Sequence, residues 1–323
     1  MNTSIENEVI EISDSGLLSG KPVLSVFMIT YNHEHFIEQA IDSILAQQTD
    51  FPFELVIGED CSTDRTRQIA LEYQHKFPEK IRVLYSKNNV GSSRNVVRTL
   101  NACRGQYIAI CEGDDYWTDP LKLAKQVAWL ETHPDSVITY HDTKTISEDN
   151  SEVIRENLQA ECTRGYSKKP LQIGAHIPTL SLCFRNVIGE LPPEFLRVVN
   201  SDTFLISLLG CYGRADYLAD IAPAMYRHHA GGIWSAIGHD EKIVKSIATH
   251  FWLSLYHRRE GREQLANIFI YKIIGQLMRY FSKKGGFAPK WFFSFVFPKQ
   301  YQALRWLLNK IGLKKSNSVG IAN

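Results

Sequence analysis

The sequence predicts an α/β protein in which a mostly parallel sheet is flanked by helices. Two observations carry this prediction. Apolar runs of strand length alternate with segments of helical apolar spacing over residues 22–142. Polar residues also follow four of the predicted strands at the point where each strand ends. Because ligands bind such sheets beyond the carboxyl ends of the strands, these polar residues should gather into one site.

The elements follow in chain order. The nearly continuous apolar run at 23–30 is typical of a strand covered on both faces, and further strands are expected at 53–58, 81–85, 107–111, 137–141 and 177–184. Helical spacing predicts helices at 33–47, 63–77, 91–103, 119–132, 203–209, 240–258 and 264–280. Residues 1–21 are polar and acidic, which predicts a flexible leader. A loop or small excursion is expected at 143–175, and a glycine-containing loop is expected at 225–236.

The formal net charge is +1, but the charge is unevenly distributed. Ten Lys or Arg residues and no acid follow Glu263, so the rest of the chain combines 26 basic with 35 acidic residues. This acidic body argues against nucleic-acid binding, and the basic, aromatic-rich tail predicts an anionic surface as its partner. Six scattered cysteines predict reduced thiols in a cytosolic protein. We expect neither a signal peptide nor a transmembrane helix, because no suitable apolar run occurs.

The stretch at 108–120 leads from an apolar strand directly into Glu112, Asp114 and Asp115. Clustered carboxylates repel one another unless a cation lies among them, and oxygen ligands suit Mg²⁺ or Mn²⁺ held together with substrate phosphates. A polar turn before a helix, with Asp119 as N-cap and Pro120 at the first helical position, is the structural alternative. That alternative leaves the adjacent Asp114 and Asp115 unexplained.

Four segments occur in a fixed order: TYNHEHFIEQAIDSILAQ, VIGEDCSTDRT, NVGSSRNVVRTL and CEGDDYW. Together they resemble the family 2 glycosyltransferases with the GT-A fold, strongly over residues 22–142 and more thinly through NSDTFLISLLGCYGRADYL and YRHHAGGIWS. The resemblance implies a metal-dependent, inverting glycosyltransferase. The donor would be a nucleoside diphosphate sugar, with UDP expected, and the cofactor a divalent cation, Mn²⁺ or Mg²⁺.

The resemblance also implies roles for individual residues. Nucleotide contacts are expected from Thr30, Tyr31, Asn32, Glu59, Asp60, Asn89, Arg94, Asp114 and Arg227. Two of them have a structural alternative: Tyr31 could be buried at a strand end, and Arg94 could be an exposed helix residue. Beside Asp60, we expect Ser62 and Asp64 to cap the following helix.

The resemblance further implies a cation site and a general base. Asp114, Asp115 and His229 are the expected metal ligands, with Glu112 in support and His228 a second choice. A metal pair of His33 and His35 is rejected, because residues two apart at a helix start face different sides. Asp202 is the expected general base, with a helix-capping role as its alternative and Asp216 and Glu194 as lesser candidates.

The predicted organisation is a leader at 1–21, a GT-A domain at 22–240 with a nucleotide-sugar half (22–142) and an acceptor half (143–240), and a helical basic extension at 241–323. The acceptor would be a hydroxyl of a glycan or lipid-linked glycan in surface polysaccharide synthesis. We expect a cytoplasmic protein whose residues 264–315 contact the cytoplasmic face of the inner membrane. Alternatively, this segment forms a helical subdomain that packs on the core.

Three other functions are alternatives to this one. A non-catalytic nucleotide-sugar-binding protein, with the basic tail contacting a membrane or partner, is the main alternative. A nucleotidyltransferase would need a Gly-rich basic loop where TYNHEH stands, and a dinucleotide-dependent oxidoreductase would need GxGxxG after the first strand.

Overall fold

A computed structural model describes residues 9–18, 20–156, 158–232 and 237–283. The chain divides into two compact units, residues 1–270 and 271–323. Of the second unit, only the end of helix α8 (Glu263–Lys283) is described. The division therefore falls inside α8, and helix α7 (His239–Arg259) belongs to the first unit instead of to a separate extension beginning at 241.

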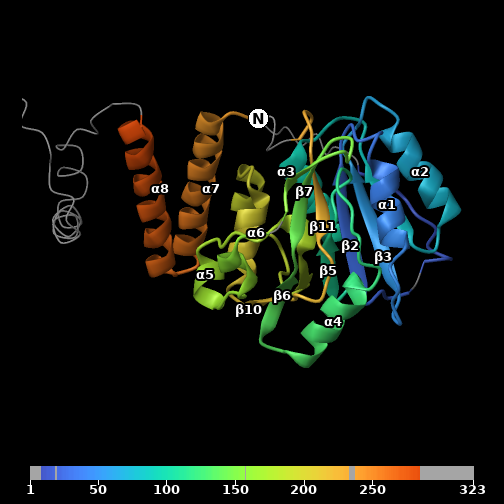
Figure 1. The fold of residues 1–323 in the computed structure, drawn as a ribbon, viewed down its shortest axis with the longest axis horizontal. Coiled ribbons are helices and arrows are strands. Elements are labelled where there is room, and N and C mark those ends of the chain that lie inside the picture. The colour runs from blue at the N-terminus through green and yellow to red at the C-terminus, as the bar shows by residue number, and fades with distance from the viewer. Residues whose placement is uncertain (1–8, 19, 157, 233–236, 284–323) are drawn as a thin grey trace, which may run out of the picture. The chain divides into compact units, whose positions relative to one another are not determined.

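The first unit is built on an eight-stranded sheet with strand order β1-β4-β3-β2-β5-β9-β6-β10 (Figure 1). Its strands are β1 (Ile10–Ile12), β2 (Leu24–Thr30), β3 (Phe53–Glu59), β4 (Ile81–Tyr85), β5 (Tyr107–Ile110), β6 (Ser136–Tyr140), β9 (Cys183–Arg185) and β10 (Arg214–Tyr217). Strands β2 to β5 pair in parallel, as do β6 and β10, whereas β1 and β9 are antiparallel to their neighbours. The predicted mostly parallel sheet is confirmed.

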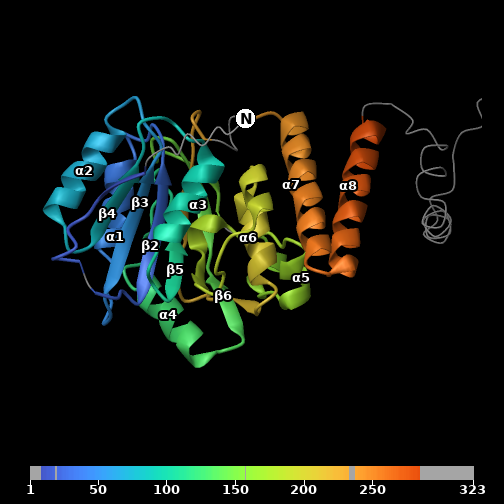
Figure 2. The ribbon, with the colours of Figure 1, turned by 180° about the vertical axis from the view of Figure 1, so that it is seen from behind.

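Helices cover both faces of this sheet (Figures 1 and 2). One apolar core joins the sheet to α1 (Ile37–Leu45), α2 (Thr66–Lys76) and α4 (Lys122–Thr132). A second core on the opposite face joins it to α3 (Ser92–Ala102), α5 (Lys168–Gln172), α6 (Ser201–Leu209) and α7. Because both faces are covered, β2 and β3 read as the continuous apolar runs seen in the sequence.

Three segments differ from the sequence prediction. Residues 10–12 are not part of a flexible leader but pair as β1 with the edge strand β4, where Glu11 bonds Arg82 at 2.8 Å. The polar region after 142 contains strands β7 (Thr143–Ser147) and β8 (Val153–Arg155). The expected loop at 225–236 begins as strand β11 (Ala224–His228). Short strands made of polar residues carry too little apolar alternation to be recognised.

Strands β11, β7 and β8 form a second, three-stranded sheet. A single bridge between Tyr116 and Met225 connects β11 to the segment that follows β5. In the remaining irregular region, short 3-10 turns lie at Ala160–Thr163, Thr179–Ser181 and Pro193–Arg197. The strand expected at 177–184 is therefore shorter, because its first half is one of these turns. The second sheet matters for function because it ends at His228, next to the predicted site residue His229.

Candidate active site

The acidic turn after β5 lies against the end of β2. The backbone N–H of Gly113 donates to the carbonyl of Ile29 at 3.0 Å. A Cβ atom at Gly113 would come within 2.7 Å of the Thr30 hydroxyl and 3.1 Å of His33 Nδ1. Only glycine fits at this position. Because Gly113 has no side chain, Asp114 can approach His33.

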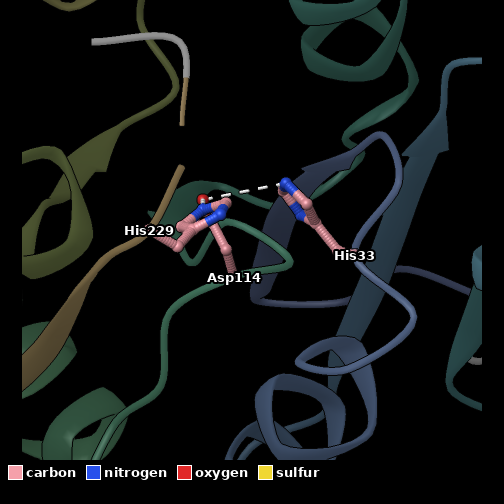
Figure 3. A group of neighbouring side chains, drawn as sticks. All are labelled: His33, Asp114 and His229. Carbon is pink, nitrogen blue, oxygen red and sulfur yellow. Dashed lines mark hydrogen bonds and ion pairs between the residues drawn. The ribbon is translucent and has the colours of Figure 1, made fainter. Parts of the chain in front are cut away.

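Asp114 stands between two imidazoles. His229 Nε2 lies 2.9 Å from Asp114 Oδ2, and His33 Nε2 lies 3.7 Å from the same oxygen. Figure 3 shows both rings turned towards this carboxylate. The other oxygen, Asp114 Oδ1, is buried and has no hydrogen-bond partner among the described residues. An orphaned carboxylate oxygen beside two imidazoles fits a divalent cation, and Glu112, Asp114 and Asp115 form a second group with suitable spacing.

The three acids of the turn have different electrostatic environments. Burial, then the charges of Asp114 and Asp202, raise the pKa of Glu112 to about 8. Burial and the charges of Asp114 and Glu112 also raise the pKa of Asp115. Burial opposes ionisation of Asp114 too, but the hydrogen bond to His229 and the charge of His33 lower its pKa overall. A bound cation would favour the ionised form of all three.

Arg227 is buried and hydrogen-bonded within the protein, so it is not an exposed phosphate ligand. The residue is 3% exposed, and its backbone N–H donates to Asp115 Oδ1 at 2.8 Å. Its guanidinium donates to four protein acceptors at 2.7–3.0 Å: the carbonyls of Asp114 and Glu148, and the side chains of Asn150 and Gln39. With four of its five N–H groups used, Arg227 fixes the acidic turn in place of the predicted nucleotide contact.

Asp60 shapes the loop expected to receive the nucleotide. Its two oxygens accept hydrogen bonds from the backbone N–H groups of Val90 and Gly91, at 2.8 and 3.0 Å. Arg98 lies 3.9 Å from Asp60 and donates to the carbonyl of Glu59 at 2.5 Å. The sequence analysis did not name Arg98 as a site residue. The signal that could have identified it is its position on the same helix as Arg94, one turn further along.

Glu59 lies behind this edge. Its side chain is fully buried and binds Arg67 Nε and the backbone N–H of Ser62, both at 2.5 Å. A carboxylate paired in this way supports the loop, in place of the predicted nucleotide contact. Ser62 is not a helix cap either, because its hydroxyl accepts the backbone N–H of Asn32 at 3.0 Å.

The remaining nucleotide candidates lie around the same edge. Tyr31 is 44% exposed, so its ring is open for stacking and is not the buried alternative. Asn32 has φ 56° and accepts the backbone N–H of Thr63 at 2.9 Å. Thr30 is buried, with its hydroxyl unpartnered among the described side chains. Asn89 and Arg94 are both exposed, Arg94 in the first turn of α3.

Asp202 is the best placed of the three base candidates. It lies in the first turn of α6, whose N-cap is Asn200. Its charge is one cause of the raised pKa of Glu112. Burial is the main cause of the raised pKa of Asp202, which makes it a stronger proton acceptor. Asp216 and Glu194 are instead bound to arginines at 2.9 Å, Arg214 and Arg259 respectively.

His33 is a second site residue, besides Arg98, that the sequence analysis did not assign to the site. The rejected pairing with His35 stays rejected, because the His35 side chain is 79% exposed and lies 3.7 Å from Glu34. His33 instead turns inwards, and burial, the largest influence, lowers its pKa. The sequence signal that could have identified His33 is its position one residue after Asn32, at the same edge of the sheet as Asp114.

Part of the site prediction lies outside the described residues. This applies to 233–236 and to 284–315, which hold most of the basic and aromatic tail. No helix in the described part of the chain is long and apolar enough to cross a membrane.

The comparisons with known proteins agree with this architecture. The family model described as "Glycosyl transferase family 2" matches residues 25–191. The protein Rv1520 of Mycobacterium tuberculosis is 36% identical over 251 residues, which cover 75% of this chain and 71% of that protein. A second relative is "Putative teichuronic acid biosynthesis glycosyltransferase TuaG" of Bacillus subtilis. It is 36% identical over 110 residues, which cover 34% of this chain and 42% of TuaG.

Among solved structures, TarS 1–349 of S. aureus in complex with UDP has a TM-score of 0.55 at 21% identity, covering 88% of this chain and 78% of that one. The same protein with UDP-GlcNAc has a TM-score of 0.57 at 20% identity, over 80% and 73% of the two chains. At these identities the likeness shows a shared fold.

The sheet, the acidic turn after β5 and the matched structures together define the GT-A fold. The chain belongs to glycosyl transferase family 2, and it is a glycosyltransferase.

Proposed function

We propose that the protein transfers a sugar, with inversion, from a UDP-linked donor to a hydroxyl of a glycan or lipid-linked acceptor in surface polysaccharide synthesis. The observation that carries this proposal is the meeting of Asp114 and His229, 115 residues apart, at 2.9 Å. Asp202 is near enough for its charge to contribute to the raised pKa of Glu112 in the same acidic turn. Solved structures of this fold bind UDP and UDP-GlcNAc, and a mannosyltransferase among them binds GDP-Man and Mn²⁺. Those ligands support a nucleotide-sugar donor.

Each residue has a defined task in this proposal. Tyr31 stacks on the base, while Thr30, Asn32, Asp60 and Asn89 line the nucleoside side of the edge. Arg94 stays exposed beside them for the diphosphate. A divalent cation held at Asp114 would neutralise the charge that develops on the leaving diphosphate.

Asp202 takes the proton of the acceptor hydroxyl as the new glycosidic bond forms. Burial raises the pKa of its carboxyl, so it accepts a proton more readily than an exposed aspartate would. Asp115 and Glu112 neighbour Asp114, and a bound cation would favour their ionised forms over the neutral forms that burial favours.

Calorimetric titration of UDP, GDP and dTDP, with and without Mn²⁺, tests the donor site. We expect UDP to bind most tightly, to need the cation, and to lose binding in Asp114→Asn. Asp202→Asn should keep nucleotide binding but lower the transfer rate by roughly 10²–10⁴-fold, because only proton transfer is removed. A folded sample that binds no nucleoside diphosphate would overturn the proposal.

We further propose that residues 264–315 contact an anionic membrane surface, which would bring the site to a lipid-linked acceptor. The ten basic residues after Glu263, without any acid, support this proposal. Co-sedimentation with vesicles that contain phosphatidylglycerol, compared with neutral vesicles, tests it. Equal sedimentation with both kinds would contradict it.

A further inference from the structure

We infer that His33 is a protein ligand of the catalytic cation, beside Asp114 and His229. The site would then offer two imidazoles and one carboxylate, a donor set that favours Mn²⁺ or Co²⁺ over Mg²⁺. This inference rests on the metal-assisted transfer proposed above and names the ligands and the metal class of that same site.

The spacing of the three side chains supports a shared ion. Their ligand atoms all lie within 4.8 Å of one another, with separations of 2.9 and 3.7 Å from the two histidines to Asp114. Two ligands that are each about 2.1 Å from a cation are roughly 3 Å apart when they meet at a right angle. The His33 and His229 rings are nearly perpendicular, at 84°, with centroids 5.8 Å apart, so they approach Asp114 from different directions (Figure 3).

The local structure holds His33 in this position. Its backbone N–H donates to Thr66 Oγ1 at 2.7 Å, and its carbonyl accepts the N–H groups of Phe36 and Ile37, both at 2.9 Å. The Phe36 ring packs 4.9 Å from the His229 ring and 6.3 Å from the His33 ring, measured between centroids. A ligand fixed by its backbone and by a shared aromatic neighbour loses little conformational entropy on binding.

The carboxylate group Glu112, Asp114 and Asp115 is the competing ligand set. Asp115 is 2% exposed, and its Oδ1 already accepts the backbone N–H of Arg227. Asp114 Oδ2, by contrast, lies 2.9 and 3.7 Å from two imidazole nitrogens, a spacing that a shared cation would bridge. These separations favour the histidine side of Asp114.

The donor set determines which metal binds. Carboxylate and water ligands suit Mg²⁺, whereas imidazole nitrogen suits first-row transition metals. With two nitrogens among three protein ligands, Mg²⁺ should compete poorly for this site. A carboxylate-only site would show a much smaller difference between these ions.

Cobalt binding to the full-length protein, without nucleotide, gives a test that does not depend on activity. We expect Co²⁺ to produce visible absorption, and His33→Gln to shift this spectrum and weaken affinity by at least roughly tenfold. His35→Gln is the matched control, because His35 is two residues away and its side chain is 79% exposed. It should leave spectrum and affinity unchanged.

A second measurement uses the unaltered protein, so it does not depend on how the variant folds. Pulsed EPR of bound Mn²⁺ should detect coupling to two imidazole nitrogens, and excess Mg²⁺ should fail to displace the ion. One coupled imidazole together with an unchanged His33→Gln spectrum would overturn the inference and leave the proposed function standing. If neither Co²⁺ nor Mn²⁺ binds, the metal-assisted part of the proposed function falls as well.

Discussion

The backbone N–H of Arg227 donates a 2.8 Å hydrogen bond to Asp115 Oδ1, so strand β11 is tied to the acidic turn after β5. The guanidinium of the same residue reaches the Asp114 carbonyl at 3.0 Å. Arg227 thus joins the two halves of the site, together with the bridge between Tyr116 and Met225. His229, two positions further along, is held against Asp114 by this connection.

Replacing Arg227 by lysine should therefore weaken the fold together with the site. Lysine keeps the charge but cannot reach four separate acceptors, so buried acceptors lose their partners. We expect the free energy of unfolding to fall by roughly 2–4 kcal/mol, and nucleotide affinity to fall with it. Chemical denaturation and nucleotide titration on the same samples measure both. His228→Gln, at the exposed neighbouring position, is the control. Lost nucleotide binding with unchanged stability would instead show that Arg227 contacts phosphate directly.

His257 should make stability depend on pH. Its side chain is fully buried against Ser207 at 3.0 Å, and burial, then the charge of Arg262, lower its pKa to about 4. Between that value and 6.5, the unfolded chain binds a proton that the folded chain does not, so stability falls as pH decreases through this window. The loss should be roughly 2–3 kcal/mol and should shrink in His257→Phe. Urea unfolding from pH 7 to pH 4 measures it, and parallel curves for the two proteins would rule it out.

Cys61 is strained by its backbone. Its φ is 61°, in the left-handed region that favours glycine. We expect Cys61→Gly to be more stable than Cys61→Ala by roughly 1 kcal/mol, because both lose the thiol and only glycine relieves the strain. Thermal unfolding of the two variants gives the comparison directly. Equal stability would mean that the loop relaxes without cost.

Gly58 should tolerate no side chain. A Cβ atom there would lie 1.9 Å from Thr99 Oγ1 and 2.6 Å from Asn95 Oδ1. Gly58→Ala should therefore cost about 1–3 kcal/mol of stability, by forcing α3 away from β3. The double variant Gly58→Ala with Thr99→Ala removes the nearer obstacle and should recover part of the loss. Denaturation midpoints of the single and double variants test this, and the absence of any recovery would locate the strain elsewhere.

Much of the fold is visible in the sequence because its signals are local. The strands β2 to β5 lie within a residue or two of their expected positions, since buried parallel strands read as continuous apolar runs. Helices α1, α2 and α4 begin three or four residues later than expected, at Ile37, Thr66 and Lys122, because polar turns precede them. The acidic turn was recognisable because three carboxylates directly follow a buried strand.

The sequence alone thus determined the α/β class, the edge of the sheet that carries the site, and the family. Tertiary structure alone decided which side chains meet there: His33 joins Asp114 and His229, while Arg227 and Glu59 are used within the protein. The physical reason is the range of each signal. Burial periodicity is repeated along neighbouring residues, whereas a contact between residues on distant strands leaves no periodic trace in either segment.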